Sequence, residues 1–122
     1  MNLSYLIEVL VNGREKPNPP ESKIKKQLVP TGKYVKDLAN YFKGSKNKKK
    51  DEQELEYVLS FLRNGSLPPK EFNNPHKIHH DFWDIHIGSA NSDWLLIVEI
   101  SNTEVKLVAT GSHSYLDKFL HT

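Results

Sequence analysis

The feature that most constrains this chain is a change of hydrophobic period near its middle. Before residue 65 the apolar residues recur at helical spacing, and from residue 82 onward they follow the alternation of β-strands. Helices that precede a run of strands pack together on one face of the resulting sheet. The order therefore predicts an α+β domain, built as an antiparallel sheet meander with two helices packed on one face.

Two helices are expected in the first half of the chain. The stretch TGKYVKDLANYFKG has apolar residues at spacings of three and four, and Gly44 is a plausible stop. The second helix is expected to begin at Asp51, because Glu54 follows three residues later in a capping-box pattern. A polar connection, SKNKKK, joins the two helices. Ahead of them, IKKQLVP predicts a first strand that ends at Pro30.

The second half predicts at least three strands. FWDIHIG, residues 82–88, places Trp83, Ile85 and Ile87 on one face and Asp84 and His86 on the other. DWLLIVEI is a continuous apolar run, which predicts a central strand buried on both faces. The turn SNT and the stretch EVKLVAT complete an antiparallel hairpin.

The 122 residues suffice for one domain with a modest core. A segment rich in proline and polar residues, REKPNPPES, reads as a linker. It separates residues 3–11, which are compatible with an added strand, a helix or a peripheral arm. We therefore divide the chain into an N-terminal extension and linker, 1–22, and a main domain, 23–122.

Several classes of protein are excluded by composition. The chain has no cysteine, which rules out disulfides and thiolate metal sites. The longest apolar run is too short to span a bilayer. At the N-terminus an apolar segment precedes a charged one, the reverse of a signal peptide. A cytoplasmic protein is expected.

The net charge of +2 conceals a strong asymmetry. Residues 23–50 contain ten lysines and one acid, Asp37, whereas residues 51–122 contain eleven acids and five lysines or arginines. A basic block of this kind fits a polyanion or an acidic protein as partner. The alternative is an ordinary solvated face.

All six histidines lie between residues 76 and 122. His76, His86 and His113 fall at predicted strand ends and loops, where side chains can converge over one face of a sheet. Such a cluster can transfer protons, because histidine titrates near neutral pH. A metal site is the alternative, but there is no HExxH motif and the spacing matches no familiar ligand pattern, so no metal is expected.

From about Lys25 to Leu116 the chain resembles the YafQ branch of the RelE/ParE toxin superfamily, small bacterial toxins of type II toxin–antitoxin modules. Four blocks carry the resemblance: PTGKYVKDL, LPPKEFNNPHKI, DIHIGSANSDWLLI and LVATGSHSYL. The last two, in this order and at this separation, are the most specific. The resemblance implies a cognate antitoxin as a partner, and no membrane.

The activity implied by the resemblance is cleavage of mRNA on the ribosome without a metal or other cofactor. The ribose 2′-OH attacks the neighbouring phosphate, and a 2′,3′-cyclic phosphate is left. The matching catalytic positions are His76, His86, Asp93 and His113. We favour His86 as the base and His113 as the acid, although the sequence leaves this assignment open. The positions expected to bind substrate or ribosomal RNA are Trp94, Lys46, Lys48, Lys49, Lys50 and Phe119.

One departure from the family pattern bears on the activity. The family usually has an arginine before the Thr-Gly turn, and this chain has Ala109. We expect Ala109 to face the scissile phosphate and its missing charge to slow cleavage. On a regular strand Lys106 points to the opposite face and cannot substitute. The alternative function is a catalytically impaired relative that acts by binding antitoxin or RNA.

Overall fold

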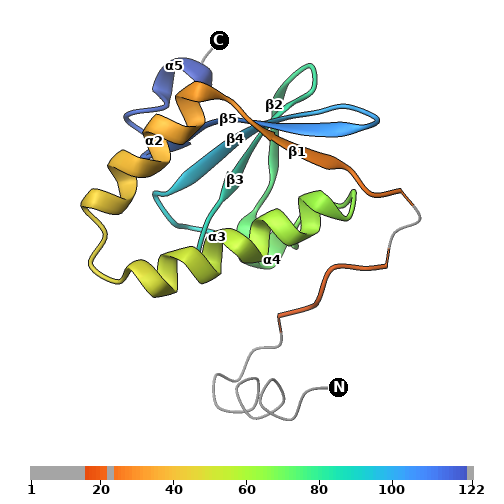
Figure 1. Ribbon diagram of the computed structural model, residues 1–122, viewed down its shortest axis with the longest axis horizontal. Helices are drawn as coiled ribbons and strands as arrows, with labels where there is room; N and C mark the ends of the chain where they lie inside the picture. The colour runs from red at the N-terminus through yellow and green to blue at the C-terminus, as the bar shows by residue number, and fades with distance from the viewer. Residues whose placement is uncertain (1–15, 22–23, 121–122) are drawn as a thin grey trace.

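The computed structural model describes residues 16–21 and 24–120, so the segment 3–11 and His121 lie outside the described residues. Its elements, in chain order, are β1 (Gln27–Pro30), α2 (Gly32–Lys43), α3 (Lys48–Arg63), α4 (Lys70–Asn73), β2 (His76–His79), β3 (Phe82–His86), β4 (Leu95–Ile100), β5 (Glu104–Gly111) and α5 (Asp117–Leu120). Figure 1 shows the strands gathered into one twisted sheet, with α2 and α3 lying along it.

The sheet has five strands in the order β1-β5-β4-β3-β2. Strands β2 to β5 pair antiparallel with their neighbours in sequence, as the meander prediction requires. Strand β1 is parallel to β5, with Gln27 opposite Glu104. The α+β class is confirmed, but the expectation of a purely antiparallel sheet is wrong at this edge. The composition of a short strand carries no information about the direction of its partner.

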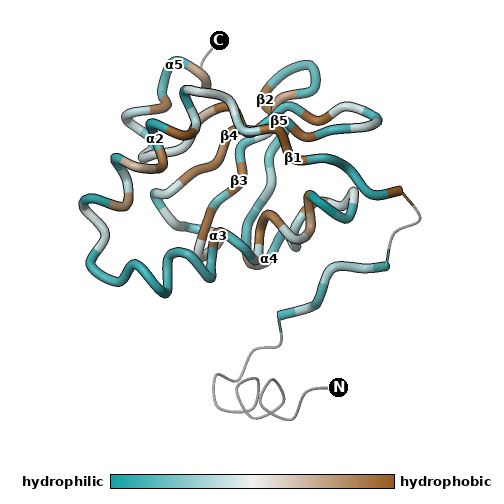
Figure 2. The backbone as a smooth tube through the Cα atoms, viewed as in Figure 1, coloured by the Kyte–Doolittle hydropathy of each residue, from teal (hydrophilic) through white to brown (hydrophobic). Residues whose placement is uncertain are grey.

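Both long helices pack on one face of the sheet, as predicted. The main core joins apolar residues of α2, α3, three strands and the β3–β4 connection: Tyr34, Leu55, Val58, Leu62, Ile85, Ile87, Trp94, Leu96, Val98, Val105 and Leu107. Figure 2 shows the apolar course of β4 through the interior, in contrast to the hydrophilic first turns of α3. Residues Ile85 and Ile87 lie on the helix-covered face, so the alternation predicted for residues 82–88 is confirmed.

The first helix begins and ends where the sequence predicts. The Thr31 hydroxyl accepts a hydrogen bond from the Tyr34 N–H at 3.2 Å, and Gly44 is the C-cap. The second helix begins earlier than predicted, because the Asn47 side chain caps it by accepting from the Lys50 N–H at 3.1 Å. The Asp51 carboxylate accepts instead from the Ser45 hydroxyl.

A second, smaller core lies on the opposite face of the sheet. Leu95, Ile97, Ala109 and Leu116 are fully buried there, and Phe119 and Leu120 of α5 pack against them. The central strand β4 is thus buried on both faces, as its continuous apolar run predicts. Because Leu116 anchors the residues that follow β5, this second core fixes the course of the chain around His113.

Two residues of the predicted linker, at the start of the described chain, contact α3. The Lys16 ammonium lies 3.1 Å from Glu54, and the Tyr57 hydroxyl donates to the Pro17 carbonyl at 2.9 Å. Within the described residues, no helix is long and apolar enough to cross a membrane.

Candidate active site

His86 stands at the end of β3 with its ring held in one orientation. Its Nδ1 lies 2.8 Å from the Ser92 carbonyl oxygen, and its own carbonyl accepts from the buried Asn73 amide at 2.8 Å. A carbonyl can only accept, so Nδ1 carries the proton and Nε2 is left for another partner. The loop between β3 and β4 therefore fixes the tautomer of this histidine.

His113 is held in the same way by Asp93. One carboxylate oxygen, Oδ1, accepts from the His113 backbone N–H at 3.0 Å and lies 2.8 Å from the ring Nδ1. The backbone hydrogen bond, and next the ring hydrogen bond, lower the pKa of the Asp93 carboxyl below its ordinary value of 3.8. Asp93 is thus ionised at neutral pH and leaves Nε2 of His113 available.

The rings of His86 and His113 lie close together. Their centroids are 5.4 Å apart and their planes differ by 46°. Each ring is fixed through Nδ1, so each can present Nε2 to one reacting group, either to remove a proton or to deliver one. The structure therefore brings together three of the predicted catalytic residues, His86, Asp93 and His113.

His76 is an exposed residue of β2, a strand that the sequence did not predict. It is paired with Asp84, and its Nδ1 lies 3.6 Å from the Asp84 carboxylate. Asp84 is buried and shares the face of β3 with His86, two residues further along. His76 therefore lies on the same side of the sheet as the His86–His113 pair.

Ala109 is not exposed, so the expectation that it faces the scissile phosphate is corrected. It is fully buried in the second core against Leu95, Ile97 and Leu116. The account of Lys106 is corrected too. A bulge in β5 pairs Ile97 with Ala109 and Glu99 with Lys106, which puts Lys106 on the same face as Ala109. Its ammonium lies 3.9 Å from Glu99, near the other end of the strand.

Trp94 is also corrected, because its indole is buried rather than offered to substrate. It stacks on Tyr41 with ring centroids 3.9 Å apart, and its Nε1–H donates to the Thr110 hydroxyl at 2.9 Å. Phe119 is half-buried against the second core, with the Lys33 ammonium 5.8 Å from its ring centroid.

The four lysines assigned to RNA lie around the start of α3. Lys46 precedes the Asn47 cap, and Lys48, Lys49 and Lys50 form the first turn; all four are exposed. Figure 1 places the α2–α3 connection and the β3–β4 loop toward the same end of the long axis.

Sequence reasoning missed three residues that support the site. Asn73 holds the carbonyl of His86, Asp84 pairs with His76, and Asp37 contacts the segment that carries His113. Only Asp37 had a visible signal, since it is the single acid in the lysine-rich block. Within the described residues, no three histidine or carboxylate side chains are placed to hold a metal ion.

Comparison with known proteins supports the resemblance read from the sequence. The model of the family described as the bacterial YafQ toxin of type II toxin–antitoxin systems matches residues 26–118. The mRNA interferase toxin YafQ of Escherichia coli K12 is 25% identical over 93 residues, which cover 76% of this chain and 97% of that protein.

Two solved structures resemble the fold. The E. coli DinJ-YafQ toxin–antitoxin complex gives a TM-score of 0.61 at 27% identity, over 76% of this chain and 98% of the matched one. A metal-bound toxin from Helicobacter pylori gives a TM-score of 0.57 at 29% identity, over 75% of this chain and 98% of that one. The chain belongs to the YafQ family of bacterial toxins of type II toxin–antitoxin systems.

Proposed function

We propose that this protein is an endoribonuclease toxin that cleaves mRNA on the ribosome. The observation that carries the proposal is the pair of imidazoles at 5.4 Å, each with Nδ1 fixed and Nε2 free to act. A relative that this chain matches over 97% of its length is named an mRNA interferase toxin, which supports the same activity.

The reaction is a transesterification that needs one base and one acid. His86 removes the proton of the ribose 2′-OH through Nε2, and the 2′ oxygen forms a bond to the adjacent phosphorus. The bond from phosphorus to the 5′ oxygen breaks, and His113 protonates that leaving oxygen. The products are a 2′,3′-cyclic phosphate and a free 5′-OH, without a metal. The ionised Asp93 suits His113 to the acid role, since a carboxylate on Nδ1 stabilises an imidazolium.

The remaining groups serve binding. His76, on the same side of the sheet, contributes a further proton donor toward the phosphate. Lys46, Lys48, Lys49 and Lys50 contact ribosomal RNA phosphates. The cognate partner is an antitoxin that covers this surface until it is removed, which the fold shared with a toxin–antitoxin complex supports. The compartment we propose is the cytoplasm, where ribosomes are available.

A second candidate function is binding without cleavage. The observation that favours it is that position 109 is a buried alanine and supplies no guanidinium for the phosphate. Within the described chain the one arginine is Arg63 on α3, and it is paired with Glu56 at 2.9 Å. A protein of this kind would sequester an antitoxin or RNA and leave the message intact.

Cleavage of mRNA on programmed ribosomes separates the two functions. Wild-type protein is expected to produce fragments that end in a 2′,3′-cyclic phosphate, and His86→Ala and His113→Ala are each expected to slow this by at least about a hundredfold. His79→Ala, which removes an exposed histidine of β2, is the matched control and should cut normally. Ribosome binding without any cleavage by the wild type would establish the second function.

A further inference from the structure

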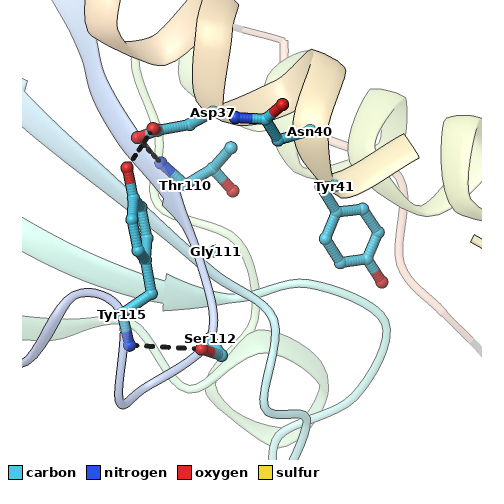
Figure 3. Close-up of a pocket in the computed structure, with 7 residues that line it drawn as sticks. All are labelled: Asp37, Asn40, Tyr41, Thr110, Gly111, Ser112 and Tyr115. Carbon is cyan, nitrogen blue, oxygen red and sulfur yellow. Dashed lines mark hydrogen bonds between the residues drawn. The ribbon is translucent and has the colours of Figure 1, made fainter. Parts of the chain in front are cut away.

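A buried carboxylate on α2 contacts the segment that carries His113 at two points. Asp37 is only 6% exposed. Its Oδ2 accepts from the Thr110 backbone N–H at 3.2 Å, and its Oδ1 accepts from the Tyr115 hydroxyl at 2.6 Å. Figure 3 shows both contacts, which reach the chain on either side of His113.

Lys33 completes this arrangement. Its ammonium lies 3.3 Å from the Asp37 carboxylate and donates to the Tyr115 hydroxyl at 3.0 Å. The hydrogen bond to Tyr115 is the main cause that raises the pKa of Lys33 above 10.5, and the neighbouring carboxylate adds to it. A buried carboxylate is costly unless it is paired and hydrogen-bonded, and Asp37 meets both conditions here.

The same segment is restrained from its other side. The Thr110 hydroxyl accepts from Trp94 and donates to the Leu95 carbonyl at 2.7 Å. Gly111 has a φ of +155°, and a Cβ built on it would stand 2.7 Å from the ring of Tyr115. The tyrosine ring therefore packs directly over Gly111, and this close contact restrains the backbone between Thr110 and Tyr115.

We propose that Asp37 is a positioning residue that sets the place of His113 opposite His86. The carboxylate fixes both ends of residues 110–115, and the short stretch between them delivers the imidazole to Asp93. The role in cleavage rests on the proposed function, whereas the mechanical role concerns the free protein. Asp37 itself touches neither histidine.

The two decisive variants are Tyr115→Phe and Asp37→Asn. A cavity of about 230 Å³ lies beside these residues, lined also by Asn40, Tyr41 and Ser112. It has room for water to take the place of a lost hydroxyl, so Tyr115→Phe is expected to fold. Tyr57→Phe is the matched control, because it removes a tyrosine hydroxyl that donates to a backbone carbonyl far along the chain.

The direct measurement is the pKa of the Asp93 carboxyl, followed by carbon NMR in the free protein. In the wild type it is lowered by the two hydrogen bonds from His113. Both decisive variants should move it back toward 3.8, because a loosened turn no longer aims those donors, and Tyr57→Phe should leave it unchanged. An unchanged Asp93 titration in folded Tyr115→Phe and Asp37→Asn proteins overturns the proposal.

The activity measurement distinguishes this proposal from the proposed function. On programmed ribosomes both variants should lower kcat by about tenfold or more and leave KM within about twofold. The reason is that they misalign His113 for the chemical step without removing a group that binds the substrate. If wild-type protein does not cleave at all, the proposed function fails, while a moved Asp93 pKa still establishes that Asp37 positions the turn. Normal kcat in both variants overturns the catalytic part.

Discussion

A single oxygen of Asp93 accepts from both the backbone N–H and the ring Nδ1 of His113, at 3.0 and 2.8 Å. The two donors come from one residue, so the carboxylate fixes the position of the Cα and the rotation of the ring at once. Asp93 stands immediately before the buried Trp94, which ties it to the core. This contact therefore holds the His113 imidazole in one position on the turn that follows Gly111.

Replacing Asp93 by Asn is expected to produce a loss of stability that depends on pH. A carboxyl whose folded-state pKa is lowered stabilises the fold above its unfolded value and loses this contribution as the pH falls. Wild type and Asp93→Asn should therefore differ in urea midpoint at pH 6, and the difference should shrink progressively as the pH falls from about 4 through the lowered folded-state pKa. Asp81→Asn, an exposed acid of the β2–β3 turn, serves as control. A constant difference down to pH 3 contradicts the assignment.

Asn73 is expected to matter for stability far more than its small side chain suggests. Its amide is 2% exposed and donates to the His86 carbonyl, while its Oδ1 has no hydrogen-bond partner among the described residues. Asn73→Ala should cost about 1–3 kcal/mol, because it removes the side-chain hydrogen bond to the part-buried His86 carbonyl. Urea unfolding measures this, with the exposed Asn102→Ala as control. Equal stabilities for the two variants would show that His86 is held by other means.

Parts of this fold follow from local sequence chemistry. Thr31 and Gly44 set the limits of α2, and the doubly buried β4 follows from its unbroken apolar run. The histidine pair was located through the resemblance, because sequence spacing alone does not bring His86 and His113 together. The start of α3 was misplaced because Asn47 and Asp51 are both good caps, and only the contact between Asp51 and Ser45 decides between them.

The misreadings of Ala109 and Lys106 have different physical causes. Ala109 is buried because the second core, with Leu116, covers it. A bulge after Leu107 shifts the alternation of β5 by one residue, so Lys106 lies on the same face as Ala109 and not on the opposite one. The sequence gives no sign of this bulge, because the stretch EVKLVAT contains no glycine or proline. The parallel pairing of β1 with β5 is equally hard to predict, because it joins segments more than seventy residues apart and nothing in the local sequence of β1 specifies it.

Reversing the charge of the lysine block is expected to weaken ribosome binding and stabilise the protein. Lys48, Lys49 and Lys50 occupy the first turn of α3, where the helix dipole disfavours positive charge. Changing these three lysines and Lys46 to Glu should raise the melting temperature. It should also make ribosome binding less dependent on salt: the slope of log K against log salt concentration should become shallower by up to about 0.7–0.9 for each phosphate contact that is lost. Lys70→Glu is the control, outside the block. An unchanged slope would mark the block as ordinary solvated surface.

Ala109→Arg is expected to destabilise the protein and to bring no gain in cleavage. The position is fully buried between Ile97 and Leu116, so a guanidinium must either displace the second core or remain unpaired within it. Overpacking alone costs about 1–3 kcal/mol, enough to lower the melting temperature by several degrees. Thr103→Arg places the same side chain on an exposed turn and should melt like the wild type. Because Leu116 is continuous with the turn that carries His113, Ala109→Arg should also slow cleavage on programmed ribosomes. A well-folded Ala109→Arg protein that cuts faster would show instead that the second core opens when the ribosome is bound, and that this position then reaches the phosphate.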